Sequence, residues 1–536
     1  MTPRRQQRAV APAVAALVAV LVAGLVGGVA VLGGLGREQA LSGGVVREAL
    51  VVDGPMTLVP PFAETPNSRD VSGLLYRGLT RTGPDARPVG ELARDWNVDA
   101  GARTFTFHLR KGLRWSDGAP ITSADALYTL SILQSDADAR SSTGQAWSGI
   151  SATAPDPLTV TYSLPQSSPA FLALTSIGLL PEHALKPRAV TTLRQVTDAP
   201  SSGPFRLLHV GRDTVQLERN PHAFERPYLD GLELHLYESR SRAVQALLGG
   251  EVDVFAGMTG DEAAQVAGAV NRRVVEGSTF AYAELLCNQK NAVLADDHVR
   301  AAIGLAIDRS GLLAGPLKGY SNPDESPIPP AISWASMAAR RTGADRAAAE
   351  KQLDAAGWRP VKQGRIKDGQ RLQVRLATVD APPYSAAAAR VAKDLAAVGI
   401  ATIPRGTTQA GLLNILQGHD FDLALTAVDN GPDPDVYVFW HSSQAGPGGF
   451  NFSGMPANSG LDKDLETGRS TADYKVRRTA YLDAQKIILD DHAAVFLYSP
   501  QALIGARDSV KGIRLPAGGA RYDLVQEWSV NSKHQL

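Results

Sequence analysis

An uncharged, largely apolar run, Ala9–Gly36, separates a short basic tail from the rest of the chain. It follows three arginines and consists mostly of alanine, valine, leucine and glycine. A membrane-spanning helix needs about 20 apolar residues, so the run is long enough to cross a bilayer. Arginines before such a segment favour a cytoplasmic N-terminus, which places everything after Arg37 outside the membrane. We therefore predict a cytoplasmic basic tail (1–8), a membrane segment (9–36), a spacer (37–44) and an exported body.

Two fates of this segment remain open from the sequence. The small residues Gly28, Val29 and Ala30 fit a signal-peptide cleavage site, whereas the length of the run fits a retained anchor. The single cysteine, Cys287, lies far from the segment, so no cysteine there can carry a lipid, and no intrachain disulfide can form. We expect an extracytoplasmic protein that is anchored through residues 9–36 or released after cleavage, and that is not a lipoprotein.

The body alternates strand-like and helix-like patterns without a repeat. Residues 104–109 and 232–236 alternate between polar and apolar side chains, which indicates half-buried strands. A capping box at Thr122–Asp125 opens an apolar helix, and further helices are expected after Asp296 and over 386–398, before Gly399. At 536 residues the chain is too long for one core. The patterns favour an α/β fold with more than one domain.

The sequence contains none of the common catalytic motifs. It has no Gly-x-Ser-x-Gly elbow, no His-Glu-x-x-His pair and no phosphate loop, and its ten histidines are scattered. Lysine plus arginine and aspartate plus glutamate both number 54, so the charge does not indicate a nucleic-acid partner. We therefore expect a protein that is not an enzyme, with no catalytic residue, no metal, no cofactor and no bound nucleic acid.

A long block after residue 91 carries a family resemblance. It resembles the signature of the large bacterial extracellular solute-binding proteins of family 5, which serve transporters of oligopeptides, dipeptides and nickel. The same family's landmarks continue in order to the end of the body. The matching motifs are Leu92–Trp96, Phe105–Gly118, Pro120–Asp125, Leu180–His183, Ser202–Phe205, Asn220–Pro221, Pro227–Gly231, Gly250–Asp253, Asp297–Ile303, Ala306–Arg309 and Asp429–Pro434.

The resemblance implies a two-lobed, periplasmic-binding-protein-like α/β fold of class II, in the large three-domain form. Two strand crossings would form a hinge, and a bound ligand would favour the closed state. The implied domains are lobe I (45–80, 188–284 and 502–536), a domain inserted on its side (81–187), and lobe II (285–501).

The resemblance also implies where the ligand lies. In peptide-binding members the aspartate that opens the Asp429–Pro434 loop neutralises the peptide ammonium, whose burial would otherwise be costly. Asn430 and Gly431 accompany it, and Trp440 walls a pocket or belongs to the core. Asn288 follows a crossing strand that could hydrogen-bond an extended ligand. The candidate ligand-binding residues are Asp429, Asn430, Gly431, Trp440, Asn288, Ser202 and Gly203.

One departure from the family bears on ligand length. Dipeptide-selective members place an arginine before a Pro-Tyr pair, but residues 379–384 read Val-Asp-Ala-Pro-Pro-Tyr. We therefore expect an oligopeptide rather than a dipeptide, captured by a monomer and delivered to the permease subunits and ATPase of an ABC importer. The alternatives are a non-peptide solute (a nickel chelate, an oligosaccharide or a glycolipid headgroup) or an envelope scaffold or sensor.

Overall fold

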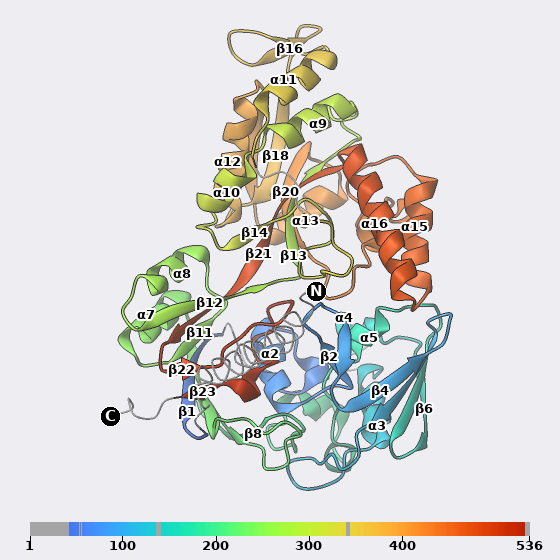
Figure 1. Cartoon of the computed structure of the whole chain (residues 1–536), viewed down its shortest axis with the longest axis vertical. Coiled ribbons are helices and arrows are strands. Elements are labelled where there is room, and N and C mark those ends of the chain that lie inside the picture. The colour runs from blue at the N-terminus through green and yellow to red at the C-terminus, as the bar shows by residue number, and fades with distance from the viewer. Residues whose placement is uncertain (1–41, 53, 55, 136–140, 339–342, 531–536) are drawn as a thin grey trace, which may run out of the picture.

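The computed structural model describes residues 42–530, apart from 53, 55, 136–140 and 339–342 (Figure 1). The predicted basic tail, the membrane segment 9–36 and most of the spacer lie outside the described residues. Within the described part of the chain, no helix combines the length and apolar character needed to cross a bilayer.

One mixed sheet of 12 strands runs through the whole molecule, and the long strand β21 (Ala494–Arg507) belongs to both of its halves. The strand order is β19-β18-β20-β13-β21-β11-β1-β10-β9-β8, and β12 and β14 pair with β21. In the half that we call lobe I the strands are β1 (Val45–Val51), β8 (Phe205–Val210), β9 (Thr214–Arg219), β10 (Gly231–Tyr237), β11 (Val254–Ala256) and β12 (Arg272–Ser278). In lobe II they are β13 (Ala281–Cys287), β14 (Ser321–Pro323), β18 (Gln373–Val379), β19 (Ala401–Thr407) and β20 (Leu423–Asp429).

Lobe I and the predicted inserted domain share one hydrophobic core. Residues such as Val46 and Leu234 of the main sheet belong to the same buried cluster as Phe105 and Trp115. The inserted segment forms its own sheet in the order β4-β5-β7-β6, and it confirms the strand predicted over 104–109. The inserted segment and its start contain β2 (Thr80–Thr82), β3 (Pro88–Gly90), β4 (Ala93–Val98), β5 (Thr104–Leu109), β6 (Ser151–Asp156), β7 (Thr159–Ser163), α3 (Ser123–Leu133), α4 (Ser142–Ala146), α5 (Phe171–Leu174) and α6 (Glu182–Leu185). The remaining elements of lobe I are α2 (Pro66–Leu75), α7 (Arg240–Gly249), α8 (Gly260–Ala267), β22 (Val510–Lys511) and β23 (Ser529–Val530).

Helices cover both faces of the lobe II sheet. One buried cluster holds the sheet against α9 (Asp297–Ala306), α10 (Arg309–Ala314), α11 (Arg346–Ala355) and α12 (Tyr384–Ala396), and we call this side face A. A second cluster holds the opposite side, face B, against α13 (Gln409–Gln417), α14 (Tyr437–Trp440), α15 (Ser459–Ser470) and α16 (Tyr474–Asp491). The short strands β15 (Arg359–Pro360), β16 (Arg365–Lys367) and β17 (Gln370–Arg371) form a separate small sheet.

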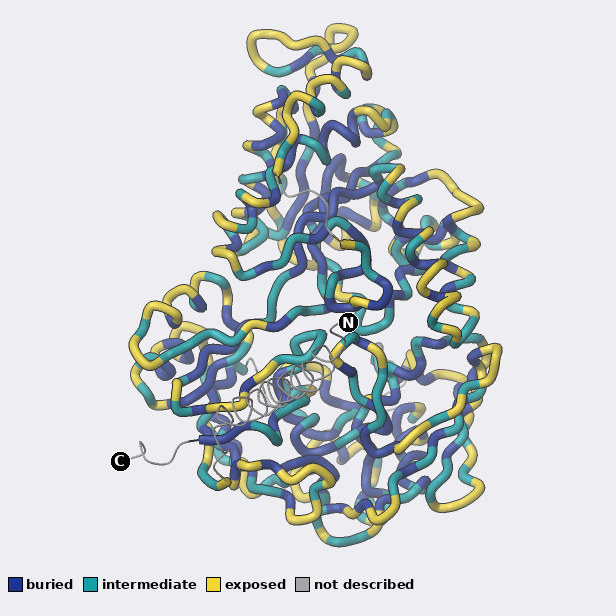
Figure 2. Tube along the Cα trace, in the orientation of Figure 1, coloured by how far each residue is buried: buried dark blue, intermediate teal, exposed yellow. Residues whose placement is uncertain are grey.

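The central strands of the sheet are buried in both lobes, whereas exposed residues concentrate at the periphery, including the edge strand β19 (Figure 2). The helices predicted after residues 122, 296 and 386 are confirmed as α3, α9 and α12. Gly399 follows α12 with φ +89°, a left-handed conformation that suits glycine at the end of a helix.

The chain passes between the lobes twice, at adjacent positions. Thr279 donates from Oγ1 to the carbonyl oxygen of Pro500 at 2.6 Å, and Ser499 donates from Oγ to that of Ala281 at 2.8 Å. The predicted boundary between residues 284 and 285 divides β13, a strand that pairs with β20 along its whole length. We therefore propose a lobe boundary between β12 and β13; the other domain boundaries remain predictions.

The parallel strands of each lobe end near these crossings. In lobe I, β1 is parallel to β10 and β11, and β11 ends at Ala256, opposite Ile504 of the crossing strand. In lobe II, β18 is parallel to β19 and β20, and β20 ends at Asp429, opposite Ala281. The carboxyl ends of parallel strands are where α/β sheets bind ligands. We call these two sets of strand ends the lobe I edge and the lobe II edge.

Candidate functional site

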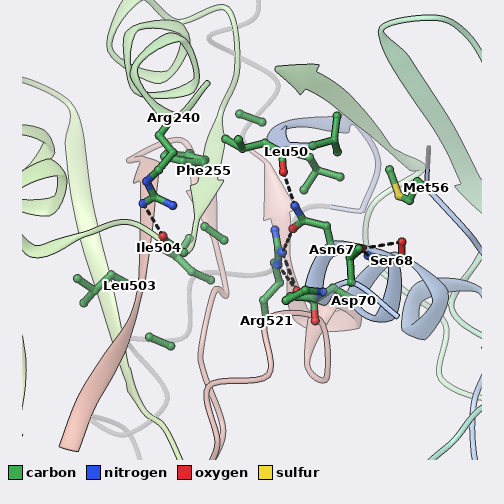
Figure 3. Close-up of a pocket in the computed structure, with 18 of the residues that line it drawn as sticks. Leu50, Met56, Asn67, Ser68, Asp70, Arg240, Phe255, Leu503, Ile504 and Arg521 are labelled. Carbon is green, nitrogen blue, oxygen red and sulfur yellow. Dashed lines mark hydrogen bonds and ion pairs between the residues drawn. The ribbon is translucent and has the colours of Figure 1, made fainter. Parts of the chain in front are cut away.

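A cavity of about 730 Å³ opens at the lobe I edge (Figure 3). It lies between the end of β1, the start of α2, the start of α7 and the part of β21 just past the crossing. This volume is within the usual range for small-ligand pockets. Its apolar lining includes Leu50, Met56, Phe255, Leu503 and Ile504.

Arg521 lies at the wall of this cavity and is committed to protein partners. Its guanidinium donates to Asp70 at 2.6 Å and to the Asn67 side chain at 2.8 Å (Figure 3). It also donates to Glu48 at 2.9 Å. The Tyr522 hydroxyl donates to the second oxygen of Glu48 at 2.8 Å. Burial raises the pKa of Glu48, and the charge of Arg521 opposes that rise. The network thus compensates a buried carboxylate.

The second cation of the cavity is also engaged. Arg240, at the start of α7, donates to the Glu262 carboxylate at 3.1 Å and to the carbonyl oxygen of Gly257 at 2.7 Å. Its guanidinium lies 5.9 Å from the centre of the Phe255 ring. Neither arginine of the cavity is therefore available as a point charge for an anionic ligand.

Asp429 stands exposed at the lobe II edge, where the sequence predicted a ligand-binding loop. It accepts a hydrogen bond from the backbone N–H of Gly431 at 3.0 Å, and Gly431 has φ +69°. Asn430 donates from its side chain to the carbonyl oxygens of Asp433 and Asp435, at 3.1 and 2.9 Å. Asn430 and Gly431 thus form the turn that presents Asp429.

Asn288 lies at the opposite end of β13 from Asp429. The antiparallel strands β13 and β20 pair from Ala281 with Asp429 at one end to Cys287 with Leu423 at the other, and Asn288 lies just past that second end. The Asn288 side chain is buried and donates to the carbonyl oxygens of Phe421 and His419, at 2.8 and 3.1 Å. The prediction that Asn288 contacts an extended ligand does not match this geometry, because its side chain is bonded within lobe II at the end of β13 away from the crossings.

Ser202 and Gly203 are buried inside lobe I and secure the end of α2. The Ser202 hydroxyl accepts from the backbone N–H of Arg77 at 2.9 Å, and the N–H of Gly203 donates to the carbonyl oxygen of Leu75 at 2.8 Å. A Cβ at Gly203 would lie 2.3 Å from the carbonyl oxygen of Leu74. These contacts explain both residues without a ligand.

Trp440 belongs to the face B core. Its side chain is 2% exposed, and its ring centre lies 6.1 Å from that of Phe496. Of the two sequence interpretations, the core tryptophan is the one that this burial matches.

Sequence reasoning missed the residues that form the lobe I cavity. A signal was present, because strand patterns over 45–51 and 231–237 are each followed by a helix start, at Thr65 and at Ser239. Both residues cap their helices through their side chains. Residues beside helix starts that follow parallel strands are good ligand-site candidates, although the sequence does not show which strands are neighbours.

Two lobes around strand ends that face a double crossing define the class of solute-binding proteins. The model of the family "Bacterial extracellular solute-binding proteins, family 5 Middle" matches residues 87–449. The chain belongs to this family of binding, non-catalytic proteins.

Curated relatives share most of their length with this chain. Protein XP55 of Streptomyces lividans is 28% identical over 454 residues, which are 83% of this chain and 82% of that protein. A putative ABC transporter peptide-binding protein of Brucella ovis is 28% identical over 419 residues, with 74% and 76% covered.

Solved structures show the same fold. The unliganded open form of MppA, a periplasmic murein tripeptide binding protein, superposes with a TM-score of 0.78 at 18% identity, covering 92% of this chain and 99% of that one. The oligopeptide-binding protein AppA of Bacillus subtilis in complex with a nonapeptide gives a TM-score of 0.67 at 22% identity, with 92% and 100% covered.

Proposed function

We propose that this protein is the extracytoplasmic binding component of an ABC importer and that it captures peptides between its lobes. The family membership and the peptide-binding description of the Brucella relative support this assignment. The permease subunits and their ATPase are the proposed partners. Attachment through residues 9–36 and a monomeric state remain predictions.

The main support for the proposal is that the lobe I edge and the lobe II edge both lie at the crossings between the lobes. A ligand that touches both the lobe I cavity and the lobe II edge stabilises the closed arrangement, because only that arrangement offers both sets of contacts. Asp429 provides the carboxylate for a peptide ammonium. It is exposed at the lobe II edge, and the one hydrogen bond of its side chain within the described part of the chain comes from the backbone N–H of Gly431.

An oligopeptide fits this edge better than a dipeptide. A dipeptide has its carboxylate only a few ångströms from its ammonium, so it needs a cation close to Asp429. Residues 379–385 and 429–437 contain no lysine or arginine, and the two arginines of the lobe I cavity bind Glu48, Asp70 and Glu262. A longer peptide can leave its carboxylate in solvent.

Native mass spectrometry of the purified full-length chain tests the proposal. We expect co-purified masses that form a peptide mixture and that are depleted in the variant Asp429→Asn. The control Asp368→Asn changes an exposed carboxylate in the turn between β16 and β17 and should retain the mixture. A single non-peptide mass in the wild type would contradict peptide capture.

A further inference from the structure

A second cavity, of about 470 Å³, lies against a different face of α2 from the lobe I cavity. Its lining includes Arg69, Ser72 and Gly73 of α2, and Tyr76 just after the helix. These residues are spaced three and four apart, so they share one face of the helix, and none of them lines the lobe I cavity. We call this second cavity the α2 pocket. Its volume is within the usual range for small-ligand pockets.

The lining of the α2 pocket is mainly apolar and includes two aromatic rings. Tyr76 is 5% exposed and Trp147, which follows α4, is 3% exposed, so both rings are held within the protein. The Trp147 ring centre lies 5.2 Å from that of Phe171 at an angle of 71° between the rings, an edge-on arrangement that aromatic pairs favour. Aliphatic surface comes from Pro60, Ala63, Leu174 and Ile177. Such a wall favours an apolar occupant.

Arg69 is the one charged residue among the described residues that line the α2 pocket. Its side chain is exposed and donates from Nη1 to the carbonyl oxygen of Glu64 at 2.6 Å. The pocket therefore offers no described carboxylate to a lysine or arginine side chain, and burial of an unpaired charge is costly. An acidic side chain would meet only this exposed arginine, and exposed ion pairs contribute little. The charges thus also favour an apolar occupant.

Gly73 leaves the α2 pocket open from the helix side. A Cβ at this position would meet no atom of the surrounding described protein within 4 Å, whereas a Cβ at Gly178 would lie 2.5 Å from the Cβ of Tyr76. Glycine destabilises a helix relative to alanine or leucine. The packing of the fold gives no steric reason for glycine at position 73, but space for the side chain of a ligand does.

The α2 pocket borders the contact between the lobes. Ala173 of α5 lines the α2 pocket and also lines a small gap whose other wall includes Pro432 of lobe II. Ser167, four residues before α5, donates from Oγ to the carbonyl oxygen of Arg469 in lobe II at 3.2 Å. Accordingly, α5 lies on the side of its lobe that faces lobe II (Figure 1). The loop that begins at Asp429 is therefore separated from the α2 pocket by α5.

A peptide that is anchored at Asp429 can reach this pocket. Pro432 is three residues from Asp429, and the chain between them spans at most about 11 Å. A helix such as α5 is about 10 Å across. An extended peptide rises about 3.3 Å per residue, so about six residues cover the sum of these two lengths.

We propose that the α2 pocket binds an apolar side chain, preferably an aromatic one, from the first six residues of a peptide whose ammonium binds Asp429. This inference rests on the proposed peptide-binding function. It adds a side-chain preference that the shared fold does not specify.

Isothermal titration of the full-length chain with hexapeptides tests the proposal, once native mass spectrometry confirms that no co-purified mass remains. One set of peptides carries a single phenylalanine at each position of hexa-alanine in turn, and a second set carries glutamate instead. We expect phenylalanine at one position or more to tighten binding at least about tenfold relative to hexa-alanine, because burial of the ring removes a large apolar area from water. Glutamate at the same position should give no such gain.

Filling the pocket from α2 assigns this gain to it. In Gly73→Leu the gain from phenylalanine should fall to about twofold or less, with the affinity for hexa-alanine retained, and Gly73→Ala should give an intermediate gain. The control Gly249→Leu changes an exposed glycine of α7 that also has open space around its Cβ position, and it should retain the full gain. Leucine forms helices better than glycine does, so urea unfolding should show no loss of stability in Gly73→Leu.

The side-chain preference and peptide binding itself can fail separately. Binding of hexa-alanine with no gain from phenylalanine at any position, or with a gain from glutamate instead, overturns the apolar preference and leaves peptide binding intact. Retention of the full gain in Gly73→Leu overturns the assignment to the α2 pocket. Failure of all the peptides to bind overturns the proposed function and with it this inference.

Discussion

At the lobe I edge Arg521 lies against Glu48 and Asp70, whereas at the lobe II edge Asp429 takes part in no ion pair with any described residue. Both edges are built in the same way, from the carboxyl ends of parallel strands followed by helices. Their charged groups differ. Those of the lobe I edge pair with one another within the fold, whereas the carboxylate at the lobe II edge stays available for a ligand. A cleft that closes on a ligand can thus combine one wall whose charges are paired with another wall that still has a carboxylate to pair with the ligand.

The largest expected effect is the loss of the lobe I network in Arg521→Met. Glu48 is fully buried and would lose its cation, which typically destabilises a protein by about 3–5 kcal/mol. The midpoint of urea unfolding should fall strongly. The control Arg405→Met removes an exposed arginine paired with the exposed Asp420 and should cost much less. Equal effects of the two variants would contradict the distinction between a buried and an available set of charges.

The second prediction concerns Asp429→Asn at the opposite edge. The asparagine oxygen can still accept from the N–H of Gly431, so stability should change by no more than about 0.5 kcal/mol. Affinity for tetra-alanine should fall about tenfold to a hundredfold, because a charge-assisted bond to the ammonium is lost. Titration calorimetry and urea unfolding measure the two quantities. A large stability loss without an affinity loss would mean that Asp429 only shapes its turn.

The third prediction concerns β13, the first strand of lobe II after the proposed boundary. Burial raises the pKa of Glu284 to about 8, from 4.5, so the folded protein retains a proton that the unfolded chain releases above pH 4.5. Stability from this group is complete below pH 4.5 and declines as the pH rises to 8. Glu284→Gln should remove that decline, which we expect to be about 2–4 kcal/mol between pH 5 and 8.

Thermal unfolding at pH 5, 6.5 and 8 measures the difference between the wild type and Glu284→Gln. Asp490→Asn serves as a control at an exposed carboxylate outside β13. Parallel pH profiles for the wild type and Glu284→Gln would show that Glu284 is ionised in the fold.

The smallest effect is expected for a contact between the lobes. The Arg87 guanidinium, next to β3 in the inserted segment, lies 5.1 Å from the ring centre of Tyr474 and 6.0 Å from that of Trp334 in lobe II. Exposed cation–π contacts contribute about 0.5–1 kcal/mol. Arg87→Ala should weaken tetra-alanine binding about two- to fivefold if this contact belongs to the closed arrangement. Arg94→Ala, which removes an exposed arginine of the same segment, should leave it unchanged.

Local patterns in the sequence predicted much of the fold. The strand over 104–109 and the helices α3, α9 and α12 follow from alternation, capping residues and a terminal glycine, all of which act over a few residues. The ordered motifs added the two-lobed arrangement. Asp429 was predicted in this way, because its loop resembles a family motif.

The rest of the site depends on pairings that short patterns do not encode. Asn288 and Asp429 were both candidates for ligand binding, and only the antiparallel register shows that they lie at opposite ends of β13 and β20.

The Glu48–Arg521 pair also sets an order of assembly. Glu48 and Arg521 are 473 residues apart in the sequence, so the ribosome adds Arg521 only after it has made the whole of lobe II. Lobe II is drawn from one nearly continuous stretch and can bury its core earlier. The lobe that begins first in the chain is therefore completed last, and until then its first strand carries a charge with no partner.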